Sequence, residues 1–182
     1  MSALSDFETI TRHAIVTDAH RIYARRYAHR IPIHKGCLFL AASFNEAARN
    51  AGIDALLQAG TASFQFQMDD GVSPTHFTYE FEAAPAMLRF QNGELPEMHV
   101  WSAIKATREL VDLSTKFQAQ QAKECQGFDW EPRFQLKPWL WVGVDWLRQC
   151  NLRYIYKADA LATMMALAFL ENFNTNREEP TR

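Results

Sequence analysis

A helical segment followed by segments of alternating polarity restricts this chain to folds that combine helices with an antiparallel sheet. Residues 37–51 are rich in Ala and Leu, contain no proline and are followed by Gly52, which suits the left-handed position after a helix. Residues 62–67 and 75–82 alternate between apolar and polar side chains, as strands with one buried face do. The pattern predicts an α+β domain in which this helix packs on an antiparallel sheet.

The rest of the chain adds elements of both kinds, and its 182 residues suit a single domain over residues 1–182. We expect a helical N-terminal segment within residues 1–33 and an apolar helix capped by Asp159. Further strands are expected at 98–104, 109–113, 138–147 and 152–157. The remaining segments are expected to be a loop rimming a cleft at 83–97, an irregular or helical stretch at 115–135 and a flexible polar tail at 172–182.

Cys37 stands at the start of the Ala-rich helix, where a thiol can become reactive. The first turn of a helix presents unpaired N–H groups and the positive end of the helix dipole, which favour a thiolate. Gly36 lets the backbone approach closely, and His34 and Lys35 add positive charge nearby. The alternative is a buried structural cysteine, because free Cys is among the most buried residue types.

His99 and Asp112 fall on the two strands of the expected hairpin. With a two-residue loop Asp112 lies directly opposite His99. With a four-residue loop at 105–108 it lies opposite Trp101, and His99 becomes its diagonal neighbour on the same face. Either register brings imidazole and carboxylate together, and the carboxylate then fixes the ring tautomer and supports the imidazolium. The alternative is a polar cross-strand pair on an open sheet face.

These motifs, in this order, resemble the transglutaminase-like branch of the papain-fold cysteine enzymes. That group includes transglutaminases, related bacterial cysteine proteases and the leader peptidases of lasso-peptide maturation. Its members carry cysteine at a helix start, His in a His-Ala-Trp-like strand and Asp in an Asp-Pro-Thr-like strand. The matching segments here are Gly36-Cys37, His99-Val-Trp and Asp112-Leu-Ser-Thr, within residues 34–115. Valine and Leu-Ser replace the small residue and the proline that are usual in the last two motifs.

The resemblance implies a papain or transglutaminase-like fold and a cysteine hydrolase or acyltransferase. Cys37 would be the nucleophile, His99 the general base and acid, and Asp112 the residue that orients His99. A thioester acyl-enzyme formed from a peptide, amide or other acyl substrate would pass to water or to an amine, without a cofactor. The Cys37 backbone N–H would stabilise the oxyanion. For a side-chain donor the sequence leaves Tyr23 and Tyr27 open, together with His34.

Two other functions remain open from the residues alone. One is a catalytically inactive domain on the same fold that binds a protein partner through its Trp-rich region or its C-terminal apolar helix. That helix would be either part of the core or a homodimer contact. The other is a metal site at Cys37, His99 and Asp112, for which no fourth ligand with recognisable spacing is present. Asp69 and Asp70 precede a glycine and are typical of a turn.

The composition of the chain restricts the classes of molecule it is expected to bind. The net charge of −2 gives no overall attraction to nucleic acid or to an anionic membrane, and the basic residues near 20–30 suit a solvated helix end. The apolar C-terminal stretch is shorter than the roughly 18 residues of a membrane span. Three scattered cysteines and the lack of a secretory signal predict a reducing cytoplasm and no disulfide framework or bound metal.

Overall fold

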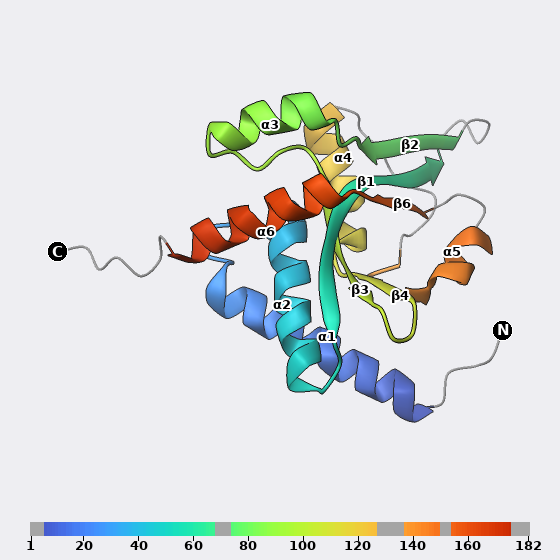
Figure 1. Ribbon diagram of the computed structural model, residues 1–182. Helices are drawn as coiled ribbons and strands as arrows, with labels where there is room; N and C mark the ends of the chain where they lie inside the picture. Colours follow the sequence, from blue (N-terminus) through green and yellow to red (C-terminus); the bar gives the residue numbers. More distant parts are fainter. Residues whose placement is uncertain (1–5, 68–73, 127–136, 150–153, 176–182) are drawn as a thin grey trace.

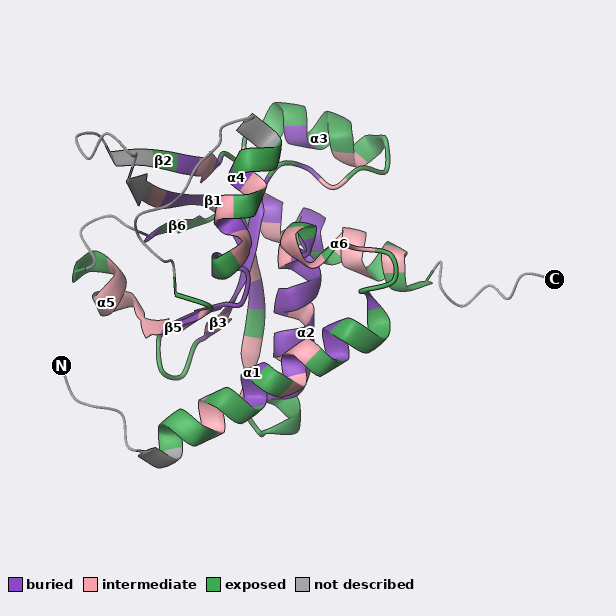
Figure 2. Ribbon diagram, turned by 180° about the vertical axis from the view of Figure 1, so that it is seen from behind, coloured by how far each residue is buried: buried purple, intermediate pink, exposed green. Residues whose placement is uncertain are grey.

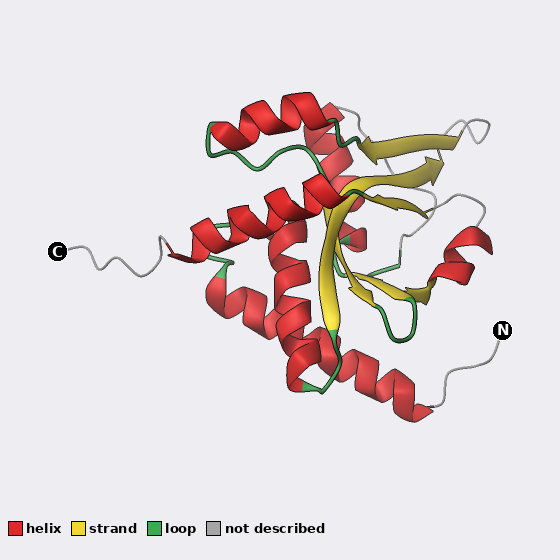
Figure 3. Cartoon of the chain, in the orientation of Figure 1, coloured by secondary structure: helices red, strands yellow, loops and turns green. Residues whose placement is uncertain are grey.

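Helices pack against an antiparallel sheet in the computed structural model of the chain, which describes residues 6–67, 74–126, 137–149 and 154–175 (Figures 1 and 3). The helical elements are α1 (Asp6–Arg26), η1 (Ile33–Lys35), α2 (Cys37–Asn50), α3 (Ala83–Gln91), η2 (Thr115–Phe117), α4 (Gln118–Gln126), α5 (Val144–Gln149) and α6 (Ala160–Thr175). The strands are β1 (Ala55–Gln67), β2 (Pro74–Tyr79), β3 (His99–Ile104), β4 (Glu109–Asp112), β5 (Leu140–Gly143) and β6 (Tyr154–Ala158).

The long strand β1 belongs to two parts of the sheet. Its first half pairs with β3, which continues through β4 to β5, and its second half pairs with β2 on one edge and β6 on the other. Gly60 is where the two parts separate, because it pairs with both His99 of β3 and Ala158 of β6. Figure 1 shows β1 turning along its length as it passes from β3 toward β2. The beginning of β3 therefore lies at the junction of the two parts.

Gly60 is required at this junction by close packing. A Cβ atom built there would lie 2.2 Å from the backbone oxygen of Lys157 and 2.9 Å from the backbone nitrogen of Asp159. Backbone atoms cannot rotate away as a side chain can, so any larger residue would push β6 off β1. The glycine thus fixes where β6 lies relative to β3.

The helix α2 buries one face between α1 and the sheet. Ala41, Phe44 and Ala48 are buried, as their helical spacing predicts, and the Ser102 hydroxyl of β3 donates to the Ala41 carbonyl oxygen at 3.3 Å. The buried residues of α1, α2 and α6 form one core with that face of the sheet (Figure 2). A second cluster on the opposite face is largely aromatic and lies beside His99.

The structure confirms an α+β arrangement, and several expected elements are present. The helix at Cys37 runs to Asn50, and Gly52 adopts a φ of 76°. The Asp159 carboxylate caps α6 by accepting from the backbone N–H groups of Leu161 and Ala162. The helix α6 buries Ala162, Met165 and Ala166 and leaves Met164 and Leu167 exposed, so one face of it belongs to the core. Among the described helices, none combines the length and the apolar character needed to cross a bilayer.

Three sequence predictions were wrong. Residues 83–97 do not form only a loop, because α3 occupies the first nine; Pro85 lies in its first turn, where a missing N–H costs little. The apolar run at 138–147 is strand only in β5 and continues as the helix α5. The flexible tail was expected from residue 172, but α6 continues to Thr175. Asp69 and Asp70 lie outside the described residues.

Candidate active site

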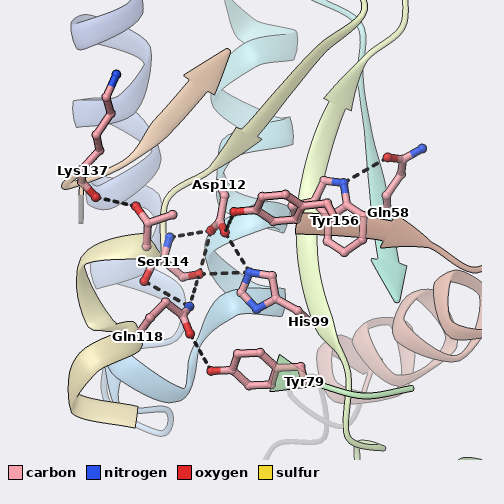
Figure 4. A network of polar contacts seen from close by, with 10 residues as sticks. Gln58, Tyr79, His99, Asp112, Ser114, Gln118, Lys137 and Tyr156 are labelled. Atoms are coloured by element: carbon pink, nitrogen blue, oxygen red, sulfur yellow. Dashed lines mark hydrogen bonds and ion pairs between the residues drawn. The ribbon is translucent and has the colours of Figure 1, made fainter. Parts of the chain in front are cut away.

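The β3–β4 hairpin brings His99 and Asp112 together. Ile104 pairs with Glu109 across a four-residue connection, so the continued register sets Asp112 level with Trp101 and diagonal to His99, the second of the two predicted registers. His99 Nε2 and Asp112 Oδ2 are 2.8 Å apart (Figure 4). Both side chains are buried, with 0% and 1% of their surface exposed. The pair is therefore an internal hydrogen bond and not a contact on an open sheet face.

Asp112 accepts hydrogen bonds from three further donors. The backbone N–H and the hydroxyl of Ser114 donate to Oδ1 at 2.8 and 2.7 Å, and the Tyr156 hydroxyl donates to Oδ2 at 2.7 Å. A second layer holds these groups: Gln118 Nε2 donates to the Ser114 hydroxyl oxygen at 3.0 Å, and the Tyr79 hydroxyl donates to Gln118 Oε1 at 2.8 Å (Figure 4). So many donors on one buried carboxyl favour the ionised form.

The His99 ring is enclosed by aromatic side chains. Phe64 and Tyr79 have ring centroids 5.2 and 5.0 Å from it, and Tyr156 and Trp101 follow at 6.1 and 6.2 Å. Trp101 is itself anchored, because its indole N–H donates to Gln58 Oε1 at 3.0 Å. This apolar enclosure strengthens the interaction of His99 with the charge of Asp112.

Cys37 approaches the same ring from the start of α2. Nδ1 of His99 is buried and has no hydrogen-bond partner of full geometry among the described residues. Proximity of the Cys37 side chain is nevertheless among the smaller causes that raise the pKa of His99. Because Asp112 holds Nε2, we infer that the thiol faces Nδ1. Cys37 is itself half-buried, and so it is not sealed inside the core.

The pKa values describe a charged pair. Burial alone would lower the pKa of His99, but the charge of Asp112 and the hydrogen bond to it, with smaller contributions from Cys37, raise it to about 10. Burial would raise the pKa of Asp112, but the charge of His99 and hydrogen bonds from His99, Ser114 and Tyr156 lower it. At neutral pH the ring is therefore an imidazolium that can donate from both nitrogens.

This pair gives stability a predictable pH dependence. The raised pKa of His99 contributes stability that is complete below its ordinary value of 6.5 and is lost as pH rises toward about 10. The lowered pKa of Asp112 contributes stability above its ordinary value of 3.8 that is lost at lower pH. We expect the free energy of unfolding from urea titrations to fall between pH 6.5 and 10 by on the order of 1 kcal/mol per pH unit. The His99→Gln variant should lack this slope, and an equal slope in both proteins would contradict the assignment.

The three side chains considered for the oxyanion site are already engaged. The Tyr23 hydroxyl donates to the Ile31 carbonyl oxygen at 2.5 Å, and the Tyr27 hydroxyl to Asn174 Oδ1 at 3.5 Å. His34 lies 3.1 Å from Glu124. Tyr23 also packs on Gly36, where an added Cβ atom would lie 2.8 Å from its hydroxyl, which explains the glycine before Cys37. The backbone N–H of Cys37 remains the donor that the helix start supplies, since first-turn N–H groups lack acceptors within the helix.

Sequence reasoning missed four residues of this network: Ser114, Tyr156, Gln118 and Tyr79. Ser114 had a usable signal, since an Asp side chain often accepts from the backbone two residues on. Tyr156 had a weaker one, because it alternates with Tyr154 on one face of its strand. Gln118 and Tyr79 had none, because their contact joins elements that are distant in the chain.

No cluster of three or more His, Cys, Asp or Glu residues suited to a metal ion occurs within the described part of the chain. Comparison with protein families, curated proteins and solved structures gives no match. The geometry of the chain itself therefore has to support any functional assignment.

Proposed function

We propose that this chain is a cysteine-nucleophile acyl-transfer enzyme on a papain or transglutaminase-like fold. The observation that carries the proposal is the buried contact of His99 Nε2 with Asp112 at 2.8 Å, with His99 Nδ1 lacking a hydrogen-bond partner among the described residues. The charge of Asp112 raises the pKa of His99, and we infer that the second nitrogen serves Cys37. A cysteine at a helix start that packs on an antiparallel sheet, with His and Asp on neighbouring strands, supports the fold assignment.

The residues suggest the following chemistry. The Cys37 sulfur, as a thiolate, forms a bond to an amide or ester carbonyl carbon, and the carbonyl electron pair moves to oxygen. The protonated His99 donates its Nδ1 proton to the leaving amine or alcohol as the C–N or C–O bond breaks, which leaves a thioester. Neutral His99 then takes a proton from water or an amine, which attacks the thioester, and the sulfur leaves as a thiolate. Asp112 keeps the ring oriented and stabilises its charge throughout.

Alkylation of the thiol tests this arrangement directly. With iodoacetamide at pH 7, we expect Cys37 to react at least about tenfold faster in the folded protein than in the protein unfolded by urea, because only the folded site places the His99 ring beside the sulfur. His99→Ala should remove most of that advantage. The rate for Cys37 is followed by mass spectrometry of its peptide, so that Cys125 and Cys150 do not interfere.

His34→Gln is the matched control, because His34 is close to Cys37 in sequence but bonds to Glu124 instead of contributing to the pair. In this variant the rate of Cys37 alkylation should stay within about twofold of the rate in the unsubstituted protein. Equal rates in folded and unfolded protein, or no effect of His99→Ala, would refute the enzyme assignment. That outcome would favour the alternative, a protein-binding domain that uses the exposed apolar face of α6, where Met164 and Leu167 lie.

A further inference from the structure

A charged contact ties α4 to the turn that precedes Cys37. The carboxylate Oε2 of Glu124 lies 3.1 Å from Lys35 Nζ and 3.1 Å from His34 Nε2, and both of these residues belong to η1. The other oxygen, Oε1, accepts from Gln120 Nε2 at 3.2 Å, so a neighbour on the same helix orients the carboxylate. The hydrogen bond from Lys35 is the main cause that lowers the pKa of the Glu124 carboxyl, and the contact is therefore charged at neutral pH. One carboxylate thus holds two consecutive residues of the turn.

The same helix also reaches the hydrogen bonds around Asp112. Gln118, in the first turn of α4, donates through Nε2 to the Ser114 hydroxyl oxygen, and the Ser114 hydroxyl donates to Asp112 (Figure 4). Six residues separate Gln118 from Glu124, which is about 9 Å along a helix. The helix α4 therefore connects the surroundings of Asp112 with the turn that leads to Cys37.

Apolar packing adds little to this connection. Among the side chains of α4 that the structure describes, only Gln118 and Ala122 are buried. A helix that buries so little apolar surface opens locally at low free energy unless other contacts hold its ends. The contact of Glu124 with η1 is therefore well placed to keep α4 and the turn together.

The turn is also restrained by α1. The Tyr23 hydroxyl donates to a backbone carbonyl oxygen of the turn, and the Tyr23 ring leaves no room for a Cβ atom at Gly36. Tyr23 from α1 and Glu124 from α4 thus hold the same short segment. The backbone of Cys37 follows directly from this segment, so the position of the turn sets where α2 begins.

We propose that Glu124 is a positioning residue, which holds the turn before Cys37 and so keeps the sulfur beside Nδ1 of His99. Glu124 acts through η1 and not on the sulfur itself. This role rests on the proposed function, since the position of the sulfur matters most if the sulfur reacts. A displacement of about 1 Å at a reacting atom can lower a rate by as much as about 100-fold. Loss of Glu124 should therefore slow the reactions of Cys37.

The charge of Glu124 alone predicts the opposite effect. A negative charge near a sulfur disfavours the thiolate, so removing that charge would speed alkylation of Cys37 if electrostatics were its only effect. A role for α4 as a cover over the thiol would also predict faster alkylation when the contact is broken. Slower alkylation is expected only from a positioning role, so the sign of the change separates these explanations.

The test compares the full chain with its Glu124→Ala variant. Cys37 is alkylated with iodoacetamide at pH 7 and its peptide is followed by mass spectrometry; we expect at least about fivefold slower reaction in the variant. The melting temperature should change by less than about 3 °C, because exposed ion pairs contribute little to stability. Glu46→Ala is the matched control: Glu46 is a similarly exposed carboxylate that pairs with Arg26 and lies about 13 Å along α2 from Cys37. In the control the alkylation rate should stay within about twofold.

Charge reversal provides a rescue that general damage to the fold would not show. Lys35→Glu alone should slow alkylation, because it repels Glu124. Adding Glu124→Lys should restore the rate to within about threefold of the unsubstituted protein, since the contact forms again with its charges exchanged. His34→Gln keeps the Lys35 contact, which agrees with the small effect expected for that variant. A double variant as slow as Lys35→Glu would show that this contact does not hold the turn.

Amide hydrogen exchange measures the turn without relying on the reactivity of the thiol. The backbone N–H groups of Lys35 and Gly36 donate to carbonyl oxygens within the turn, so a looser turn exposes them to exchange. Their exchange, followed by NMR, should be at least about fivefold faster in Glu124→Ala and unchanged in Glu46→Ala.

The outcomes for Glu124 and for the proposed function can be told apart. Faster or unchanged alkylation in Glu124→Ala, or unchanged exchange at Lys35 and Gly36, would overturn the positioning role. If Cys37 of the unsubstituted protein reacts no faster folded than unfolded, the proposed function fails, and the exchange result alone decides whether Glu124 holds the turn. If the unsubstituted protein is activated and Glu124→Ala matches it, only the role of Glu124 is refuted.

Discussion

Asp112→Ala should lower the free energy of unfolding by about 3–5 kcal/mol at pH 7. The substitution leaves the His99 imidazolium without its counter-charge in a fully buried position and removes the shared acceptor of Ser114 and Tyr156. An unpaired buried charge costs far more than a lost surface ion pair, since no water replaces the partner. Urea denaturation followed by circular dichroism measures the loss.

Two control variants separate charge from shape. Asp112→Asn keeps an oxygen that can accept from Ser114 but removes the negative charge, so we expect a smaller loss of about 1–3 kcal/mol. Asp145→Ala removes an exposed carboxylate whose contact with Arg148 is 3.5 Å long, and it should change stability by less than about 0.5 kcal/mol. If Asp112→Ala cost no more than Asp145→Ala, the charged pair would not exist.

Gly60→Ala should destabilise the fold by about 3 kcal/mol or more. The added methyl would lie 2.2 Å from the Lys157 backbone oxygen, and relief requires β6 to move away from β1. Such a movement would also draw Tyr156 from Asp112, so the loss should include part of the hydrogen bonding at the site. We expect a lower urea midpoint together with faster exchange of the β6 amide hydrogens.

Two other glycines provide matched controls. Gly143→Ala adds a methyl to open space and should be nearly neutral, within about 0.5 kcal/mol. Gly93→Ala also meets no neighbour but has a φ of 77°, so it should cost about 1 kcal/mol through backbone strain alone. A loss at Gly60 no larger than that at Gly93 would show that β6 is not held by close packing.

The sequence was sufficient to predict those features that depend on residues close together in the chain. The helix start at Cys37 and the hairpin follow from short-range patterns, and both permitted registers of the hairpin brought His99 to Asp112. The sequence could not choose between those registers, because loop length is set by how the strands pack against β1 and β5. The apolar run at 138–147 gave the wrong element for α5, since a short apolar run fits a buried strand and a helix equally well.

The surroundings of the pair were beyond sequence reasoning for a different reason. Tyr156 and Gln118 reach the site only after distant strands and helices have packed, and neither residue type marks itself out in its own segment. The charge state of His99 depends on this packing, since the enclosing rings and the extra donors to Asp112 together decide which form is favoured. Residue identities indicated the pair, and tertiary packing determines its protonation.

The pairing of β6 with the second half of β1 has a consequence for protein synthesis. The bond from Tyr156 to Asp112 joins positions 44 residues apart, so the carboxylate lacks this donor until β6 has left the ribosome. A nascent chain that already contains Cys37, His99 and Asp112 can form the hairpin but not the closed surroundings of the pair. The hydrogen bonding around His99 and Asp112 is therefore complete only after β6 has been translated and has docked beside Gly60.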